Sequence, residues 1–211
     1  MKTRNTILIF ILGLLMSSCL VKSLHSYYKE SDVIYKPELL GTFTDADGAV
    51  WEISRYSFSK GFMEGDSIDN SYLVEMYEDS RHKSRFNVHL FKLDGVSYLD
   101  FAPIRPDRPE VLTELHLVPT HSIARIEVIS DDELIISWFD EEWLTKLFEE
   151  NRVKIAHEVV TTTDVLQPTE YVLTAGTEEL QKFIIKYGNT ELPVDCGENK
   201  SFSCTKLIRQ R

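Results

Sequence analysis

The residues best suited to chemistry are two histidines that have acidic residues near them in the chain. His116 and His121 flank a short proline-containing segment, and Asp100 and Glu114 are the nearest candidates for a carboxylate partner. An imidazole beside a carboxylate can act as a general base, and convergent imidazoles with a carboxylate can bind a metal ion. Histidines at such positions more often pack or hydrogen-bond at strand ends. A hydrolase is therefore the least favoured of three functional hypotheses, after a ligand-binding protein and an interaction or structural module.

Motifs of established catalytic or phosphate-binding chemistry are absent from the sequence. It contains no Gly-x-Ser-x-Gly elbow, no His-Glu-x-x-His helix, no Gly-rich phosphate loop and no Cys-x-x-Cys pair. Asp45 and Asp47 look like the start of a calcium loop, but Trp51 and Ile53 occupy the stretch where later ligands are needed. A hairpin turn explains both acids better. We predict no catalytic residue, no metal and no cofactor.

The N-terminus has the composition of a secretory signal. Lys2 and Arg4 precede an apolar run at 7–16, which is too short to span a bilayer because a spanning helix needs about 20 residues. The run ends in Leu15-Met16-Ser17-Ser18-Cys19, which resembles the lipobox of bacterial lipoproteins.

This resemblance implies that residues 1–18 are a signal peptide and that Cys19 is diacylated after cleavage. A lipid anchor of this kind would give the protein membrane lipid as a partner. Leu20 rather than Asp follows Cys19, and this implies sorting to the outer membrane, with the domain facing the periplasm.

Composition describes a folded, acidic domain. The chain has 34 acidic against 23 basic residues, a formal charge of −11, and 23 aromatic residues (3 Trp, 9 Tyr and 11 Phe). The aromatic content excludes disorder throughout, and the negative charge argues against a nucleic-acid partner, whose phosphates need clustered Lys and Arg. The length suits one domain.

We predict a lipidated tether at 19–36 and a single β-rich domain at 37–211. Cys196 and Cys204 bracket the turn-forming residues 197–200 near the end of that domain. In an oxidising compartment a disulfide-closed loop is the favoured interpretation, with two free thiols as the alternative.

The domain has the alternating pattern of antiparallel strands. Asp47-Gly48 and Asp94-Gly95 are hairpin-turn signals, and the alternation around the second predicts a hairpin at 85–102. A second hairpin is predicted at 122–138, and further strands at 70–78, 153–160 and 171–174.

Two segments change to helical periodicity. The first is predicted at 140–151, with Asp140 as N-cap and an apolar stripe that includes Trp143 and Leu147. The second has Thr177 as its predicted N-cap and is predicted to stop at Gly188. Both are short and amphipathic.

Two resemblances bear on the fold. The run Leu39-Leu40-Gly41-Thr42-Phe43, followed by Trp51, resembles the opening of lipocalin-like barrels, with Phe43 in place of the usual Trp. Segments 89–100 and 173–183 resemble uncharacterised bacterial lipoproteins of the Bacteroidota type. The second resemblance implies an envelope location and a β-rich domain, and neither implies ligand residues.

The sequence therefore predicts an α+β fold that is mainly β, an antiparallel meander curling toward a partial, lipocalin-like barrel with two short amphipathic helices. Such barrels often enclose a small-ligand cavity. We predict a membrane-anchored envelope lipoprotein that is not an enzyme and binds a small or apolar ligand. The alternative is a lipid-tethered interaction or structural module that contacts an envelope protein. The candidate pocket residues are Trp51, Tyr72, Phe86, Tyr98 and Trp138.

Overall fold

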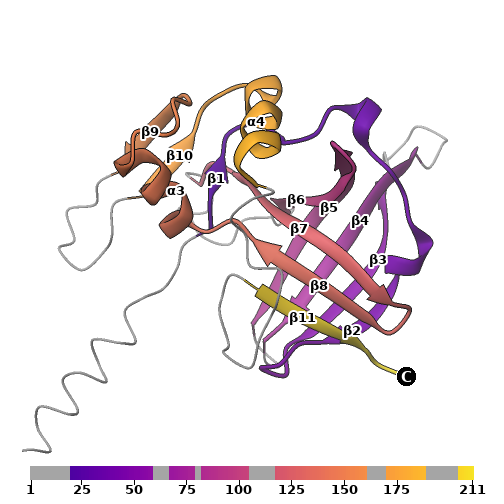
Figure 1. The fold of residues 1–211 in the computed structure, drawn as a ribbon. Coiled ribbons are helices and arrows are strands. Elements are labelled where there is room, and N and C mark those ends of the chain that lie inside the picture. The colour runs from indigo at the N-terminus through magenta and orange to yellow at the C-terminus, as the bar shows by residue number, and fades with distance from the viewer. Residues whose placement is uncertain (1–19, 59–66, 79–81, 105–116, 161–169, 189–203) are drawn as a thin grey trace, which may run out of the picture.

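The main feature of the fold is a closed antiparallel barrel of eight strands (Figure 1). The computed structural model describes residues 20–58, 67–78, 82–104, 117–160, 170–188 and 204–211. The barrel strands are β2 (Gly41–Thr44), β3 (Val50–Phe58), β4 (Ser67–Tyr77), β5 (Lys83–Leu93), β6 (Val96–Pro103), β7 (His121–Ser130), β8 (Glu133–Trp138) and β11 (Cys204–Arg209). They follow the order β6-β5-β4-β3-β2-β11-β8-β7, and pairing of β6 with β7 closes the ring. The mainly-β, lipocalin-like prediction is confirmed, and the barrel closes completely.

Turn chemistry places the hairpins as predicted. Asp94 and Gly95 have φ of 46° and 85° between β5 and β6, and Gly48 has φ of 88° between β2 and β3. Positive φ at these positions is what tight hairpin turns require. Strands β5–β6 and β7–β8 are the two predicted hairpins, in antiparallel register.

Strand β11, which the sequence patterns did not predict, closes the barrel between β8 and β2. The β11–β2 pairing is short, with Ile208 opposite Thr44 and Arg209 opposite Phe43. Arg209 reinforces this seam, since its guanidinium donates to the backbone carbonyls of Asp131, Leu40 and Glu38, each at 2.7 Å.

Cys204 is the first residue of β11. Cys19 and Cys196 lie outside the described residues, so their predicted lipidation and disulfide pairing stay predictions.

The N-terminal segment, predicted to be a tether, is built into the domain. Val21 and Tyr27 are fully buried, and β1 (Lys22–Ser23) pairs with β7 on one side and with β10 (Glu170–Leu173) on the other. Two 3-10 helices follow at Glu30–Asp32 and Pro37–Leu39. The prediction of a tether to residue 36 is therefore wrong from Leu20 onward, because the sparse apolar side chains of this segment complete a core.

An outer layer lies beside the barrel (Figure 1). It contains β1, β10, β9 (His157–Val160), α3 (Glu141–Glu149) and α4 (Thr177–Phe183), which continues into a π-helical turn at Ile184–Gly188. The predicted cap is confirmed, since the Asp140 carboxylate accepts from the Trp143 N–H at 2.8 Å. In α4 the N-cap is Gly176, and the Thr177 hydroxyl donates instead to the Ser26 carbonyl at 2.8 Å.

No helix among the described residues is long and apolar enough to cross a membrane.

Two hydrophobic cores share the strands β5, β6 and β7. The barrel core takes Leu90, Leu99 and Ala124 from these strands, and the outer core takes their neighbours Phe91, Tyr98 and Ile123. Because successive side chains point to opposite faces of a strand, these strands are buried on both sides where these residues lie. The outer faces of these strands form part of the surface on which α3 and α4 pack.

Candidate functional site

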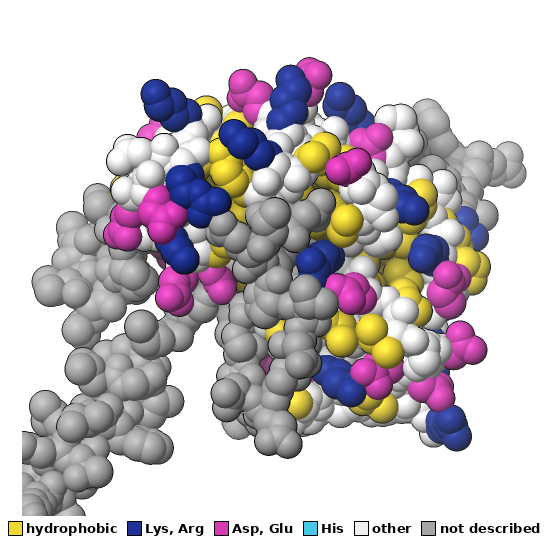
Figure 2. Space-filling view, viewed as in Figure 1, with side chains coloured by type: hydrophobic (Ala, Val, Ile, Leu, Met, Phe, Trp, Pro, Cys, Tyr) yellow, Lys and Arg dark blue, Asp and Glu magenta, His cyan; other side chains and the backbone are white. Residues whose placement is uncertain are grey.

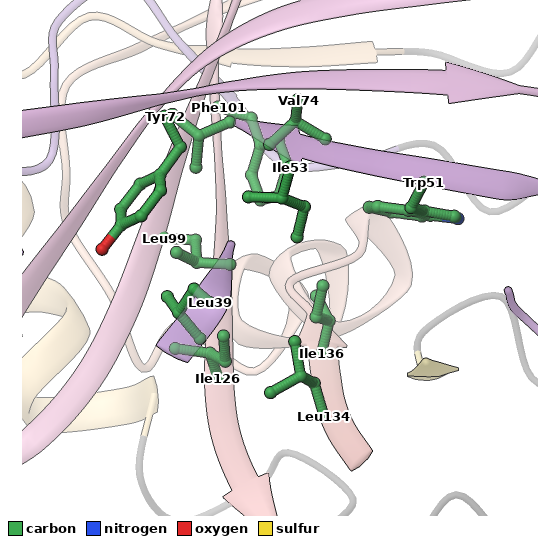
Figure 3. Close-up of a pocket in the computed structure, with 11 residues that line it drawn as sticks. Leu39, Trp51, Ile53, Tyr72, Val74, Leu99, Phe101, Ile126, Leu134 and Ile136 are labelled. Carbon is green, nitrogen blue, oxygen red and sulfur yellow. The ribbon is translucent and has the colours of Figure 1, made fainter. Parts of the chain in front are cut away.

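The barrel interior, where a ligand was predicted, is almost completely filled by side chains. The remaining cavity measures about 20 Å³, whereas pockets for small ligands measure about 300–1,000 Å³. A cavity of this size holds a water molecule at most. Figure 3 shows how its apolar lining converges from several strands, and the lining residues include Leu39, Ile53, Val74, Leu99, Ile126, Leu134 and Ile136.

The two tryptophans predicted to line the pocket are core residues whose polar groups are already used. The Trp51 indole N–H donates to the Asp45 carboxylate at 3.1 Å, and that of Trp138 donates to the Thr205 hydroxyl at 3.1 Å. The other Asp45 oxygen accepts from the Ala49 N–H at 2.9 Å. Asp45 thus acts as a hairpin-turn residue, as the sequence predicted.

Tyr72 and Phe86 also belong to the barrel side of the sheet. The Tyr72 hydroxyl accepts from the Lys36 N–H at 2.7 Å, and burial raises the Tyr72 pKa to about 12. Phe86 is half-buried and meets Phe101 edge-on, with ring centroids 5.9 Å apart. Tyr98 lies on the opposite face of the sheet, in the outer core against Phe91. Of the five predicted residues, Trp51 and Tyr72 line the small barrel cavity, whereas Phe86, Tyr98 and Trp138 do not.

The predicted imidazole–carboxylate pair does form on the outer face of the barrel. The His121 Nδ1 lies 2.6 Å from one oxygen of fully buried Asp100, and the other oxygen accepts from the Tyr27 N–H at 2.8 Å. His116 and Glu114 lie outside the described residues. Asp100 thus ties the N-terminal segment to β6 and β7.

A stacked pair of aromatic rings also holds the N-terminal segment against the barrel. Tyr28 stacks on His89 with ring centroids 4.3 Å apart, and its hydroxyl lies 3.2 Å from the His89 Nε2. In the described part of the chain, the Asp100–His121 pair and the Tyr28–His89 contact therefore have a structural role. They hold the N-terminal segment against the barrel.

The larger hollow lies in the outer layer, between the chain that follows α3 and the helical segment that begins with α4. We call it the α3–α4 groove; it offers about 620 Å³ and is lined by residues 151–156 together with Glu179, Lys182, Phe183, Lys186 and Tyr187. The Tyr187 hydroxyl donates to the Arg152 carbonyl at 2.5 Å, which joins the two walls.

The α3–α4 groove is basic and has an apolar base. Four of its lining residues are cationic, Arg152, Lys154, Lys182 and Lys186, against one acid, Glu179. Figure 2 shows Lys and Arg side chains in dark blue near yellow hydrophobic side chains over this end of the molecule, with Asp and Glu side chains in magenta among them.

This groove is not among the sites predicted from the sequence, although its residues form recognisable local patterns. Arg152 and Lys154 alternate with Val153 and Ile155, and Lys182 and Lys186 are four residues apart on one helical face. The topology that brings these segments together was not predictable from either pattern.

No set of three His, Cys, Asp or Glu residues within the described ranges is arranged to hold a metal ion. No protein-family model, curated protein or solved structure matches the sequence.

Proposed function

We propose that the protein is a lipid-anchored lipoprotein of the bacterial outer membrane whose periplasmic domain binds a small molecule in the α3–α4 groove. One observation carries this proposal: the hollow of ligand size, about 620 Å³, lies outside a barrel whose interior retains only about 20 Å³. The barrel then serves as a rigid support, and the outer layer carries the site.

The position of the proposed anchor favours a domain held close to the bilayer. Leu20 bridges to Asp140, and the Val21 N–H donates to the Phe139 carbonyl at 2.9 Å. Because one residue spans at most about 3.6 Å, acyl chains on Cys19 would hold the domain directly at the membrane surface. Two or more acyl chains anchor stably without further membrane contacts.

We propose binding rather than hydrolysis as the role of the domain. The Asp100–His121 pair has the composition of a catalytic dyad, but both Asp100 oxygens already have partners, and one of these is a backbone N–H of the N-terminal segment. A structural role accounts for this arrangement.

An interaction module is the second candidate, favoured by the edge strand β9. Val159 and Val160 are 50% and 43% exposed, and β9 pairs only with β10 among the described strands. An extended segment of an envelope protein could add to such an edge.

Native mass spectrometry of the mature protein, purified from membranes in a neutral detergent, tests the proposal. A stoichiometric mass excess that disappears on denaturation, beyond the mass of the acyl chains, is expected for a bound small molecule. The bare lipoprotein mass, together with a protein crosslinked through β9 in intact cells, would favour the interaction module.

The anchor is tested separately by Cys19→Ala. We expect the substitution to leave a full-length, unlipidated protein that no longer partitions into the detergent phase. Unchanged partitioning would refute the lipoprotein assignment without affecting the groove.

A further inference from the structure

The walls of the α3–α4 groove are joined by contacts that place positive charge around one ring. The Lys186 Nζ lies 4.9 Å from the centroid of the Tyr187 ring, and the Arg152 guanidinium carbon lies 6.0 Å from it. The Tyr187 hydroxyl bonds to the Arg152 backbone on the facing wall. The groove is therefore held by specific contacts at the aromatic ring that forms part of its base.

The charge of the groove is opposite to that of the chain. Its lining carries four cations and one acid, while the whole protein has a formal charge of −11. A concave surface of one sign raises the local concentration of ions of the other sign.

Only part of this positive charge is neutralised by neighbours. Arg152 pairs with Glu150 at 3.1 Å and Lys182 with Glu178 at 3.8 Å, and these pairs are exposed, which makes them weak. Lys154 and Lys186 form no ion pair with any residue in the described ranges. The ammonium groups of Lys154 and of Lys186, the second of which also lies over the Tyr187 ring, can thus pair with the anionic group of a ligand.

The base of the groove is apolar. Phe183 is 5% exposed and Tyr187 is 9% exposed, and Val153 and Ile155 pack half-buried against the same outer core. Phe183 in turn contacts Trp143 of α3, with ring centroids 5.4 Å apart. The apolar surface that the groove offers comes from the half-buried Val153 and Ile155, with only small exposed parts of Phe183 and Tyr187. A compact apolar body would cover this surface, and a bare inorganic ion would not.

We propose that the α3–α4 groove binds a small organic anion, a phosphate monoester or carboxylate attached to a compact apolar or aromatic body. The anionic group pairs with Lys154 and Lys186, and the apolar body packs on Val153 and Ile155 beside the exposed edges of Phe183 and Tyr187. This inference rests on the proposed binding function and specifies the ligand class of the same site.

Titration calorimetry of the detergent-solubilised lipoprotein with phenyl phosphate tests the inference. We expect phenyl phosphate to bind more tightly than inorganic phosphate, which lacks the ring, and more tightly than benzyl alcohol or benzyltrimethylammonium, which lack the negative charge. Equal affinity for phenyl phosphate and benzyl alcohol would overturn the anion preference.

Charge reversal locates the site. The K154E/K186E variant is expected to weaken phenyl phosphate binding at least about tenfold, because like charges then face the ligand. Lys92→Glu is the matched control, since Lys92 is an exposed lysine of β5 outside the groove lining, and it is expected to bind normally. An unfolding curve for each variant confirms that the fold is intact.

Two results would overturn the inference, and the second of them would leave the proposed binding function intact. Unchanged binding by K154E/K186E would show that the anion does not bind in the groove. A neutral molecule that co-purifies and is displaced by substitutions in the groove would contradict anion selectivity, while leaving the groove as a binding site.

Discussion

The barrel interior and the α3–α4 groove differ in packing although both are lined by aromatic and aliphatic side chains. In the interior, side chains from strands all around the ring meet and leave about 20 Å³, and the indole N–H groups of Trp51 and Trp138 already have partners. In the groove, only residues 151–156 and the segment that begins with α4 face each other, and they leave about 620 Å³ bordered by lysines. A closed and filled barrel can therefore serve as a support, with binding capacity in the layer beside it.

Phe101→Ala in the barrel core should destabilise the fold more than any other substitution proposed for this comparison. Phe101 is 3% exposed and its ring lies 4.7 Å from that of Trp138. Removing a buried phenyl ring should lower the free energy of unfolding by about 3–5 kcal/mol. Urea unfolding measures this effect.

The control for this substitution is Ile129→Ala, because Ile129 is 53% exposed on β7 and should change stability by only about 0.5 kcal/mol. If Phe101→Ala lowered the free energy of unfolding by no more than Ile129→Ala does, the interior would be loosely packed and able to admit a ligand.

Asp100→Ala should have a smaller effect, located where the N-terminal segment meets the barrel. It leaves the Tyr27 N–H and the His121 imidazole without their acceptor, which should cost about 1–3 kcal/mol. Hydrogen exchange should become faster in residues 20–36 than in β3 or β4.

Asp100→Asn provides the comparison, since its amide oxygen can still accept from Tyr27, and it should lose less stability. Unchanged exchange in residues 20–36 after Asp100→Ala would show that the segment is held without this carboxylate.

The smallest effect is expected for Glu141→Gln, which tests the outer layer alone. Burial raises the pKa of Glu141, while Lys22 and the Tyr171 N–H act to lower it. A raised folded-state pKa means that the charged carboxylate costs stability above that pKa, and that this cost disappears as the pH falls through it. Glu141→Gln should therefore be more stable than the parent at neutral pH, with the gain disappearing in acid.

Glu142→Gln is the matched control, because Glu142 is exposed in the same helical turn and shares the same helix dipole. A pH-independent loss of stability in Glu141→Gln, measured by thermal unfolding between acid and neutral pH, would contradict the burial argument.

Much of the fold could be predicted because turns and helix ends are determined by short stretches of sequence. The turn at Asp94-Gly95 and the cap at Asp140 depend on neighbouring residues, and both are confirmed. The buried role of the 20–36 segment was not predictable, because Val21 and Tyr27 are isolated apolar residues in a polar stretch and only tertiary packing buries them.

The candidate site was less predictable than the fold. Tyr98 and Leu99 are both apolar and adjacent, so alternation alone could not say which of them faces the barrel interior. Lys154 and Lys186 lie far apart in the sequence, and their shared groove depends on how the outer layer packs.

Hydrogen–deuterium exchange of the lipoprotein, with phenyl phosphate, with toluene and without either, tests most directly whether binding occurs outside the barrel. We predict that phenyl phosphate slows exchange at 151–156 and 179–187 and leaves β4 and β8 unchanged, while toluene protects neither region. Protection of β4 and β8 by either compound, with no protection of the groove by phenyl phosphate, would contradict the account and return the ligand site to the barrel interior.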